Sequence, residues 1–251
     1  MNSFTRQRTS YIRLFQYEIM CPKFRDFYDF FTETFIEGEY FFVAGNNDPK
    51  IIDCGGDFGM SAIYFKCLYP EATLLIFEPS SSRYSCLKRN IKENDIAHTK
   101  ALNCALSSKN GYIYFDIMKS RVRGQNRMRT ERVRCCRLSD YINDVIDLLK
   151  VDIEGSEYDV MKEVHASGKL TNVKKMFLEY HIYTEADVSR MREITELIKN
   201  NGFRIYARRK KYHYVIYAVN QLFSNKLNKE HMLTCSANIV EDNRLFSEAN
   251  S

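Results

Sequence analysis

The sequence predicts an α/β fold in which helices cover both faces of a mostly parallel sheet and an antiparallel hairpin closes the C-terminal end. Three observations predict it. Short apolar runs alternate with helical segments over residues 50–200, as in sheets that are buried on both faces. Three glycines within residues 53–59 mark a strand-to-helix turn. Two segments of strand-like composition, 203–208 and 213–220, end the pattern.

Periodicity and turn residues predict the individual elements. Residues 22–36 start at Pro22 and carry phenylalanines at helical spacing, which predicts an amphipathic helix packed on the core. Residues 40–43 fit a short strand. The other expected strands are 50–54, 72–77, 101–106, 112–117, 132–137, 147–153 and 175–181. The other expected helices are 60–69, 80–94, 138–143, 156–166 and 188–200.

Composition limits the class of protein. We expect one domain at residues 46–220, a helical extension at 1–45 and a polar tail at 221–251. Hydrophobic residues at 45% and charged residues at 27% exclude general disorder. The sequence has no signal peptide and no stretch suited to a membrane span. The eight cysteines include no C-x-x-C pair, so we expect reduced thiols in a cytoplasmic protein.

The formal net charge of +5 is concentrated in one segment. Residues 119–137 hold eight Lys and Arg side chains and a single acid, Glu131, so the rest of the chain is slightly acidic. This distribution argues against a nucleic-acid-binding domain that is basic throughout.

A glycine-rich turn with the sequence D-C-G-G-D-F-G occupies residues 53–59. Glycines let the backbone approach a ligand closely, and the N–H groups at the next helix start can meet an acceptor. Glu78 lies nineteen residues beyond Gly59, where a doubly wound sheet places an acid on a ribose diol. A dinucleotide fingerprint needs glycine where this chain has Cys54, which argues against NAD or FAD. A turn that serves only the fold would leave the position of Glu78 unexplained.

A second group of polar residues lies in segment 147–157, with the sequence D-L-L-K-V-D-I-E-G-S-E. In an extended strand, Lys150, Asp152 and Glu154 share one face. Asp152 and Glu154 would stand at the carboxyl end of the strand, where ligands bind in open α/β sheets. The alternative is that Glu154, Ser156 and Glu157 only cap the following helix and interact favourably with its dipole.

These motifs together resemble the FkbM family of class I S-adenosylmethionine (SAM)-dependent methyltransferases, over about residues 48–182. The motifs are D-x-G-x-x-x-G, F-E-P, K-x-D-x-E-G-x-E-x-x-V-M and L-E-Y-H. The resemblance implies a Rossmann-like methyltransferase sheet, SAM as methyl donor and usually a hydroxyl acceptor. It implies that the methionine part of SAM is lined by Asp53, Gly55, Gly56, Asp57 and Gly59. It also implies that Glu78 holds the ribose hydroxyls and that the strand end at Asn103 and Ala105 flanks the adenine.

The glycine turn departs from the family pattern, which commonly reads D-x-G-A-N-x-G. Gly56 in place of alanine should be benign. Asp57 in place of asparagine adds a charge that suits the ammonium group of SAM but repels its carboxylate.

Three residues are candidate catalytic groups for deprotonating a hydroxyl. His181 ends the L-E-Y-H motif, and its reference pKa of about 6.5 suits a general base; a structural strand-end histidine is the alternative. Burial or mutual repulsion would raise the pKa of Asp152 or Glu154. The three together would also suit a divalent metal. We favour the metal-free route because no D-D pair or H-x-x-x-H spacing supports a dedicated site. His165 and His213 are expected to be structural.

The acceptor hypotheses differ in their partners. We favour O-methylation of a small molecule or glycan, and we expect Arg123, Arg127 and Arg129 to bind an anionic acceptor from a basic hairpin insertion at about 107–137. A hairpin that is merely solvated is the alternative. A nucleic-acid methyltransferase is supported by this insertion and the basic run 208–211, but no N-P-P-Y-type motif is present. A non-catalytic SAM-binding module is favoured only by Asp57. The oligomeric state is left open.

Overall fold

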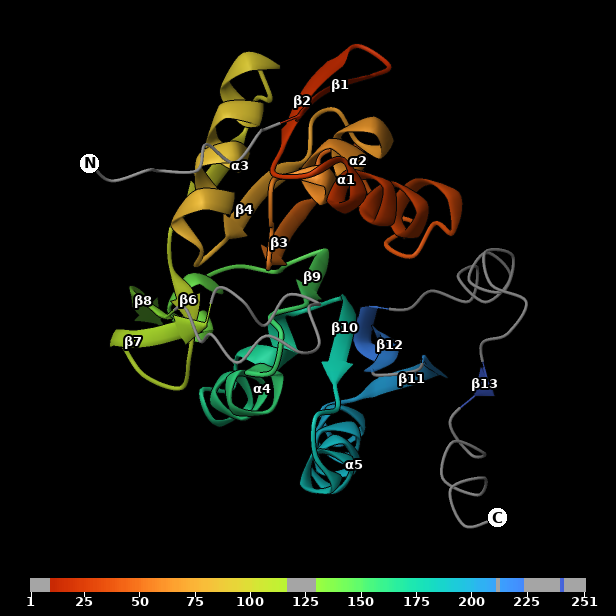
Figure 1. Cartoon of the computed structure of the whole chain (residues 1–251). Coiled ribbons are helices and arrows are strands. Elements are labelled where there is room, and N and C mark those ends of the chain that lie inside the picture. The colour runs from red at the N-terminus through yellow and green to blue at the C-terminus, as the bar shows by residue number, and fades with distance from the viewer. Residues whose placement is uncertain (1–9, 117–129, 211–212, 224–239, 242–251) are drawn as a thin grey trace.

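The structure is a computed structural model that describes residues 10–116, 130–210, 213–223 and 240–241. Most of its strands belong to one central sheet (Figure 1): β3 (Lys50–Cys54), β4 (Thr73–Phe77), β5 (Thr99–Leu102), β9 (Leu148–Val151), β10 (Lys175–His181), β11 (Phe203–Arg209), β12 (His213–Asn220) and β13 (Val240–Glu241). Among the described residues the strand order is β13-β11-β12-β10-β9-β3-β4-β5. The strands from β10 to β5 are parallel, and β12 pairs antiparallel with both β10 and β11.

Helices cover both faces of this sheet (Figure 1). One face carries α2 (Met60–Leu68) and α3 (Ser81–Glu93), and the other carries α4 (Glu157–Ala166) and α5 (Glu185–Asn200). Alternate residues of β3 serve the two layers: Ile51 packs with the α2 and α3 side chains, whereas Ile52 packs with those of α4 and α5. The predicted α/β fold with a doubly covered, mostly parallel sheet is therefore confirmed.

The N-terminal extension is only partly helical. An antiparallel hairpin of β1 (Ser10–Leu14) and β2 (Tyr17–Cys21) precedes α1 (Phe24–Phe31), which continues as the π-helical turn η1 (Thr32–Ile36). The hairpin was not predicted. Its attachment is a long-range one, because the Asn90 side chain of α3 accepts from the Met20 N–H and donates to the Met20 carbonyl. The phenylalanines of the predicted helix do stack in series, with ring centroids of Phe27 and Phe31 5.8 Å apart.

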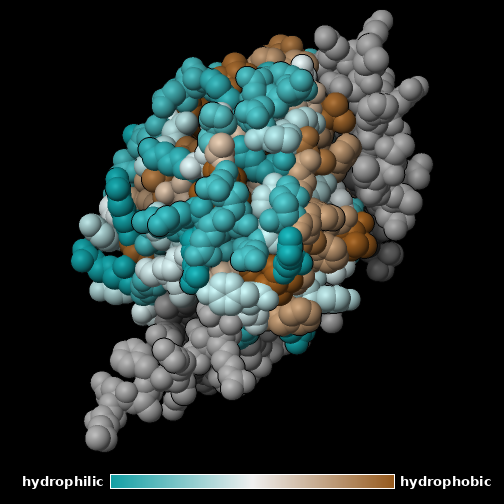
Figure 2. Space-filling model, turned by 90° about the horizontal axis from the view of Figure 1, so that it is seen from above, coloured by the Kyte–Doolittle hydropathy of each residue, from teal (hydrophilic) through white to brown (hydrophobic). Residues whose placement is uncertain are grey.

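The outer surface of the molecule is mixed. Viewed from above, it is largely hydrophilic, with apolar side chains gathered along one edge (Figure 2). The extension contributes exposed aromatic side chains: Tyr11, Phe15, Phe24 and Tyr28. Among the described residues, no helix has both the length and the apolar character needed to cross a bilayer. The seven cysteines in the described part of the chain are free.

The strand expected at 40–43 is wrong. Tyr40 and Phe42 are buried, but their segment forms no ladder. The Tyr69 hydroxyl donates to the Phe42 carbonyl at 2.9 Å and accepts from the Ala44 N–H at 2.8 Å. A side chain therefore satisfies the backbone groups that a neighbouring strand would have satisfied.

The single strand expected at 101–106 is divided between two sheets. β5 ends at Leu102 in the central sheet, and β6 (Ala105–Leu106) begins a second sheet with β8 (Thr130–Cys136) and β7 (Gly111–Asp116). β7 and β8 pair antiparallel. The remaining short helices are 3₁₀ turns: η2 (Leu138–Tyr141), where a longer helix was expected, η3 (Lys169–Asn172) and η4 (Gln221–Phe223). The basic residues Arg123, Arg127 and Arg129 lie outside the described residues.

Candidate active site

The glycine turn between β3 and α2 has no room for side chains at its critical positions. Gly55 has a φ of +93°, and a Cβ atom built there would overlap the Asp152 carbonyl oxygen. A Cβ atom on Gly56 would overlap the Ile76 side chain. Gly59 precedes α2 with a φ of +98°. Close approach therefore requires glycine at positions 55 and 56, and a positive φ favours glycine at positions 55 and 59.

The buried side chain of Lys150 stabilises this turn. Lys150 Nζ lies 3.0 Å from Asp53 Oδ1 and donates to the Gly55 carbonyl at 3.0 Å. Ser61 Oγ donates to the other Asp53 oxygen at 2.5 Å. Although burial opposes the charge, Asp53 and Asp152 together raise the pKa of Lys150 above its usual value. Asp53, expected to line the methionine part of SAM, is held in the turn by Lys150 and Ser61.

Glu78 is buried at the carboxyl end of β4 and is fixed by the backbone. Its Oε2 accepts from the Asp57 N–H at 2.9 Å and its Oε1 from the Ser80 N–H at 2.8 Å. Burial raises the pKa of Glu78 to about 8, against the opposing effects of the Ser80 hydrogen bond and of Lys150. Asn103 Nδ2 donates to the carbonyls of Glu78 and Pro79. Asn103 therefore holds the turn that positions Glu78.

Asp57 has a partner that the sequence analysis missed. It adopts a φ of +48°, and its carboxylate forms an ion pair with the guanidinium of Arg83 in the first turns of α3. The sequence did contain a signal for this ion pair, because Asp57 and Arg83 have opposite charges and follow two successive strands. Neighbouring parallel strands bring the segments at their carboxyl ends together. The pairing offsets the negative charge that Asp57 adds to the family pattern.

The carboxyl ends of β3, β4 and β9 border a cavity of about 410 Å³. It brings together residues predicted for two different roles: Gly55, Asp57, Glu78 and Ala105 from the cofactor set, and Asp152 and Glu154 from the catalytic set. The extension, α3 and the β7–β8 sheet complete its wall: Lys23, Asp26, Phe30, Arg83, Ile113, Tyr114, Phe115 and Thr130. Among the described residues, the predicted site residues that do not line it are Asp53, Gly56, Gly59, Asn103 and His181.

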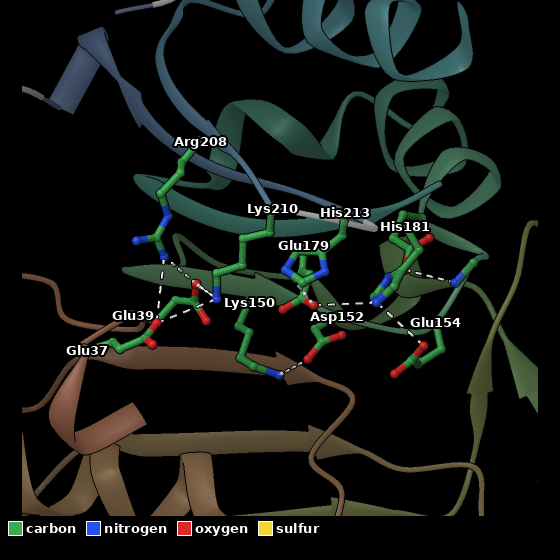
Figure 3. A network of polar contacts seen from close by, with 12 residues as sticks. Glu37, Glu39, Lys150, Asp152, Glu154, Glu179, His181, Arg208, Lys210 and His213 are labelled. Carbon is green, nitrogen blue, oxygen red and sulfur yellow. Dashed lines mark hydrogen bonds and ion pairs between the residues drawn. The ribbon is translucent and has the colours of Figure 1, made fainter. Parts of the chain in front are cut away.

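Beside this cavity, the three candidate catalytic residues lie close together (Figure 3). Polar ligand atoms of Asp152, Glu154 and His181 all lie within 4.8 Å of one another. The Asp152 side chain is 14% exposed and lies 3.7 Å from Lys150 Nζ. Burial, and next Glu179, raise the pKa of Asp152 well above its usual value. Glu154 accepts a hydrogen bond from the Tyr183 hydroxyl at 3.0 Å.

His181 lies among carboxylates. Its Nδ1 lies 2.9 Å from Glu157 Oε1, and its Nε2 lies 3.4 Å from Glu179 Oε1. Burial opposes the charge, but hydrogen bonds to Glu157 and Glu179 raise the pKa of His181 to about 11. An imidazolium has no free lone pair, so this arrangement does not suit the general-base role expected for His181. Glu157 also accepts from the Gly155 N–H at the start of α4.

The sequence of this chain matches a known protein family over the segment that forms the cavity. The family model described as "Methyltransferase FkbM domain" matches residues 53–205. The chain belongs to the FkbM methyltransferase family. The matched segment runs from the start of the glycine turn into β11, and it includes every described residue assigned above to the cavity except those of the N-terminal extension.

Curated relatives of this FkbM chain are fungal and bacterial. It is 30% identical to "Methyltransferase 1" of Beauveria bassiana, over 52% of this chain and 64% of the relative. It is 31% identical to "Methyltransferase sdnD" of Sordaria araneosa, over 53% and 67%. It is 29% identical to the "2-O-methyltransferase NoeI" of Sinorhizobium fredii, over 55% and 63%. The chain thus spans about two thirds of the length of the curated relatives it matches.

A solved structure shares the fold. The FkbM methyltransferase from Methylobacillus flagellatus aligns with a TM-score of 0.55 and 16% identity, over 75% of this chain and 47% of that one. At this identity the likeness concerns the fold alone.

Proposed function

We propose that this FkbM protein is a SAM-dependent methyltransferase that methylates a hydroxyl group. The observation that carries the proposal is the single cavity shared by the glycine turn, Glu78, Asp152 and Glu154. A donor held by Gly55 and Glu78 would present its reactive end toward the two acids, because all four lie at the same edge of the sheet. Methyl transfer requires the nucleophile and the methyl group in line at about 3–3.5 Å. A cavity lined by the donor residues on one side and by the two acids on the other can hold both groups in this way.

The residues present fit SAM. The bare backbone at Gly55 permits close approach, Glu78 offers a fixed acceptor for ribose hydroxyls, and Ala105 borders the cavity where adenine is expected. Arg83 offsets the charge of Asp57 and offers a cation for the carboxylate of the methionine part. When bound, SAM would supply an electrophilic methyl group on a sulfonium centre.

Asp152 is the general base that we favour. It lines the cavity, whereas His181 is not among the lining residues and both of its ring nitrogens face carboxylates. A raised pKa brings Asp152 closer to neutral pH, which improves a carboxylate as a proton acceptor. His181 would then stabilise and orient the acids around it.

The direct test of the donor site is Glu78→Ala. Because charged hydrogen bonds contribute about 1.5–3 kcal/mol, we expect the SAM dissociation constant to rise about 10- to 100-fold. Calorimetric titration measures it, with Glu93→Gln on the exposed side of α3 as control. No binding at millimolar SAM would overturn the proposed function, and an unchanged Glu78→Ala constant would overturn the ribose assignment.

The raised pKa of Glu78 makes the same binding pH-dependent. Lys150 lowers and Asp53 raises this pKa of about 8, at which the carboxyl is mostly neutral at pH 6.5. The carboxyl must therefore ionise before it can accept hydrogen bonds from both ribose hydroxyls. SAM affinity should therefore rise with pH up to about 8.5, approaching tenfold per unit below the pKa, and Glu78→Gln should remove the slope.

We further propose an anionic small-molecule or glycan acceptor. Phe115 and Thr130, which lie on either side of segment 117–129 in the sequence, both line the cavity. The segment that carries the predicted acceptor-binding arginines is therefore joined to the cavity wall at both ends. Replacing Arg123, Arg127 and Arg129 by serine should raise the KM of an anionic acceptor at least about tenfold, with little change in SAM binding. A screen of acceptors coupled to S-adenosylhomocysteine release measures this. Unchanged turnover would reduce the segment to a solvated hairpin.

Two other functions have weaker support. In the basic run 208–211, Arg208 and Lys210 both pair with the buried Glu39 side chain, which leaves less charge for nucleic-acid phosphates (Figure 3). The charge of Asp57, the feature that favoured a non-catalytic module, is paired with Arg83.

A further inference from the structure

A second cluster of ligand-type side chains lies where β10 ends and β12 begins (Figure 3). It consists of Glu179 and His181 of β10 and His213 of β12. His181 and His213 are directly opposed in the antiparallel ladder, and Glu179 is two residues before His181 on the same face. The three ligand atoms lie within 4.8 Å of one another.

The separations in this cluster match those around a bound ion. Glu179 Oε1 lies 3.4 Å from His181 Nε2 and 3.4 Å from His213 Nε2. Ligands at about 2.0–2.1 Å from a metal in tetrahedral geometry are about 3.4 Å apart. Direct hydrogen bonds between these groups would be about 2.7–2.9 Å long. The contact between His181 and Glu179 is thus a long hydrogen bond, and these two separations also suit bonds to a common centre.

The surroundings of His181 orient it as a ligand. Glu157 Oε1 contacts Nδ1 at 2.9 Å, which directs Nε2 toward Glu179. A carboxylate on the far nitrogen is the usual support of a metal-bound histidine. Glu157 is itself buried and fixed by the Gly155 N–H, so the imidazole has little freedom to turn away.

Charge also favours a cation here. Carboxylates gather around the cluster: Asp152, Glu154, Glu157 and Glu179. Of the lysines near it, Lys150 is already engaged by Asp53 and Gly55, and Lys210 by Glu39. Lys150 also lies 3.7 Å from Asp152, whereas the described ion pairs of Glu154, Glu157 and Glu179 are with histidines. A divalent ion would balance the charge of these three acids.

We propose that Glu179, His181 and His213 bind one divalent transition-metal ion, which takes the place of the proton on His181 Nε2. Two imidazoles and one carboxylate suit zinc, iron or manganese and leave coordination positions open. Asp152 and Glu154 lie next to this cluster, with ligand atoms within 4.8 Å of that of His181. Resting on the proposed function, the ion would coordinate the acceptor hydroxyl there and make it more acidic, the proton passing to Asp152. This ligand set differs from the Asp152, Glu154 and His181 set considered from the sequence.

Cobalt(II) titration of the full-length, chelator-treated protein tests the site. We expect visible d–d absorption bands that saturate at one ion per chain and that zinc displaces. His213→Gln should weaken binding at least about 100-fold, as loss of a direct ligand. His165→Gln, an exposed histidine of α4 bonded to Asn201, should leave it unchanged. If cobalt binds equally to His213→Gln, or does not saturate, the site is wrong.

Two further measurements keep the result interpretable. Thermal unfolding without metal shows whether His213→Gln is folded, and Glu179→Gln provides a second ligand variant with the same expected loss. SAM titration of the metal-free protein separates this proposal from the function on which it rests. SAM binding without cobalt binding removes the metal site alone. Cobalt binding that depends on His213 without SAM binding removes the methyltransferase proposal alone.

Discussion

Gly55→Ala is expected to destabilise the protein by roughly 3 kcal/mol or more and to abolish measurable SAM binding. An alanine at a φ of +93° costs about 1–2 kcal/mol, and overpacking adds about 1–3 kcal/mol. The added methyl group would overlap the Asp152 carbonyl oxygen, which is a backbone atom and cannot move away by a side-chain rotation. Relief therefore requires β3 and β9 to separate where the glycine turn meets Asp152.

Gly168→Ala is the matched control. Gly168 also has a positive φ, +73°, but no atom lies within 4 Å of its Cβ position. It should lose about 1–2 kcal/mol from backbone strain alone. Denaturant unfolding of both variants and SAM titration of each give the comparison. Equal losses in the two variants would contradict the close approach at Gly55.

Asp152→Asn is expected to reduce turnover about 10²- to 10⁴-fold, the usual range for loss of a general base. SAM affinity should change less than about threefold, because Lys150 keeps its contacts with Asp53 and Gly55. The carbonyl of residue 152, which packs against Gly55, is also retained. The amide has nearly the shape of the acid but cannot accept the proton.

The measurements are single-turnover rates and calorimetric SAM binding, with Asp144→Asn, an exposed acid paired with Lys50, as control. Turnover of the Asp152→Asn variant at the wild-type rate would remove Asp152 as the base. A loss of SAM affinity as large as the loss of turnover would assign Asp152 to binding.

Most of the central sheet was predictable from local sequence. The strands at 50–54, 175–181 and 213–220 have the predicted bounds, because each is an apolar or alternating run between polar and turn residues. Leu102 and Ala105, by contrast, belong to different sheets although the sequence predicts one strand containing both. The residue types in this segment do not indicate that the chain leaves the central sheet between them.

The contacts that complete the site were less predictable. Asp57 with Arg83, and His181 with His213, join residues that are distant in sequence and meet only once the strand order is known. His213 was expected to be structural, because no local spacing pairs it with another ligand. Its place beside His181 depends on β12 lying between β10 and β11, an arrangement that periodicity does not specify.

That placement of β12 has a consequence for the folding unit. The family match ends at residue 205, inside β11 and before β12 begins. A chain cut there would leave β10 as an edge strand, with the ladder from Lys175 to His181 unpaired on one side. Exposed, long and apolar edges of this kind promote association between chains. We therefore expect a chain truncated at residue 205 to associate more readily than a chain that keeps β11 and β12.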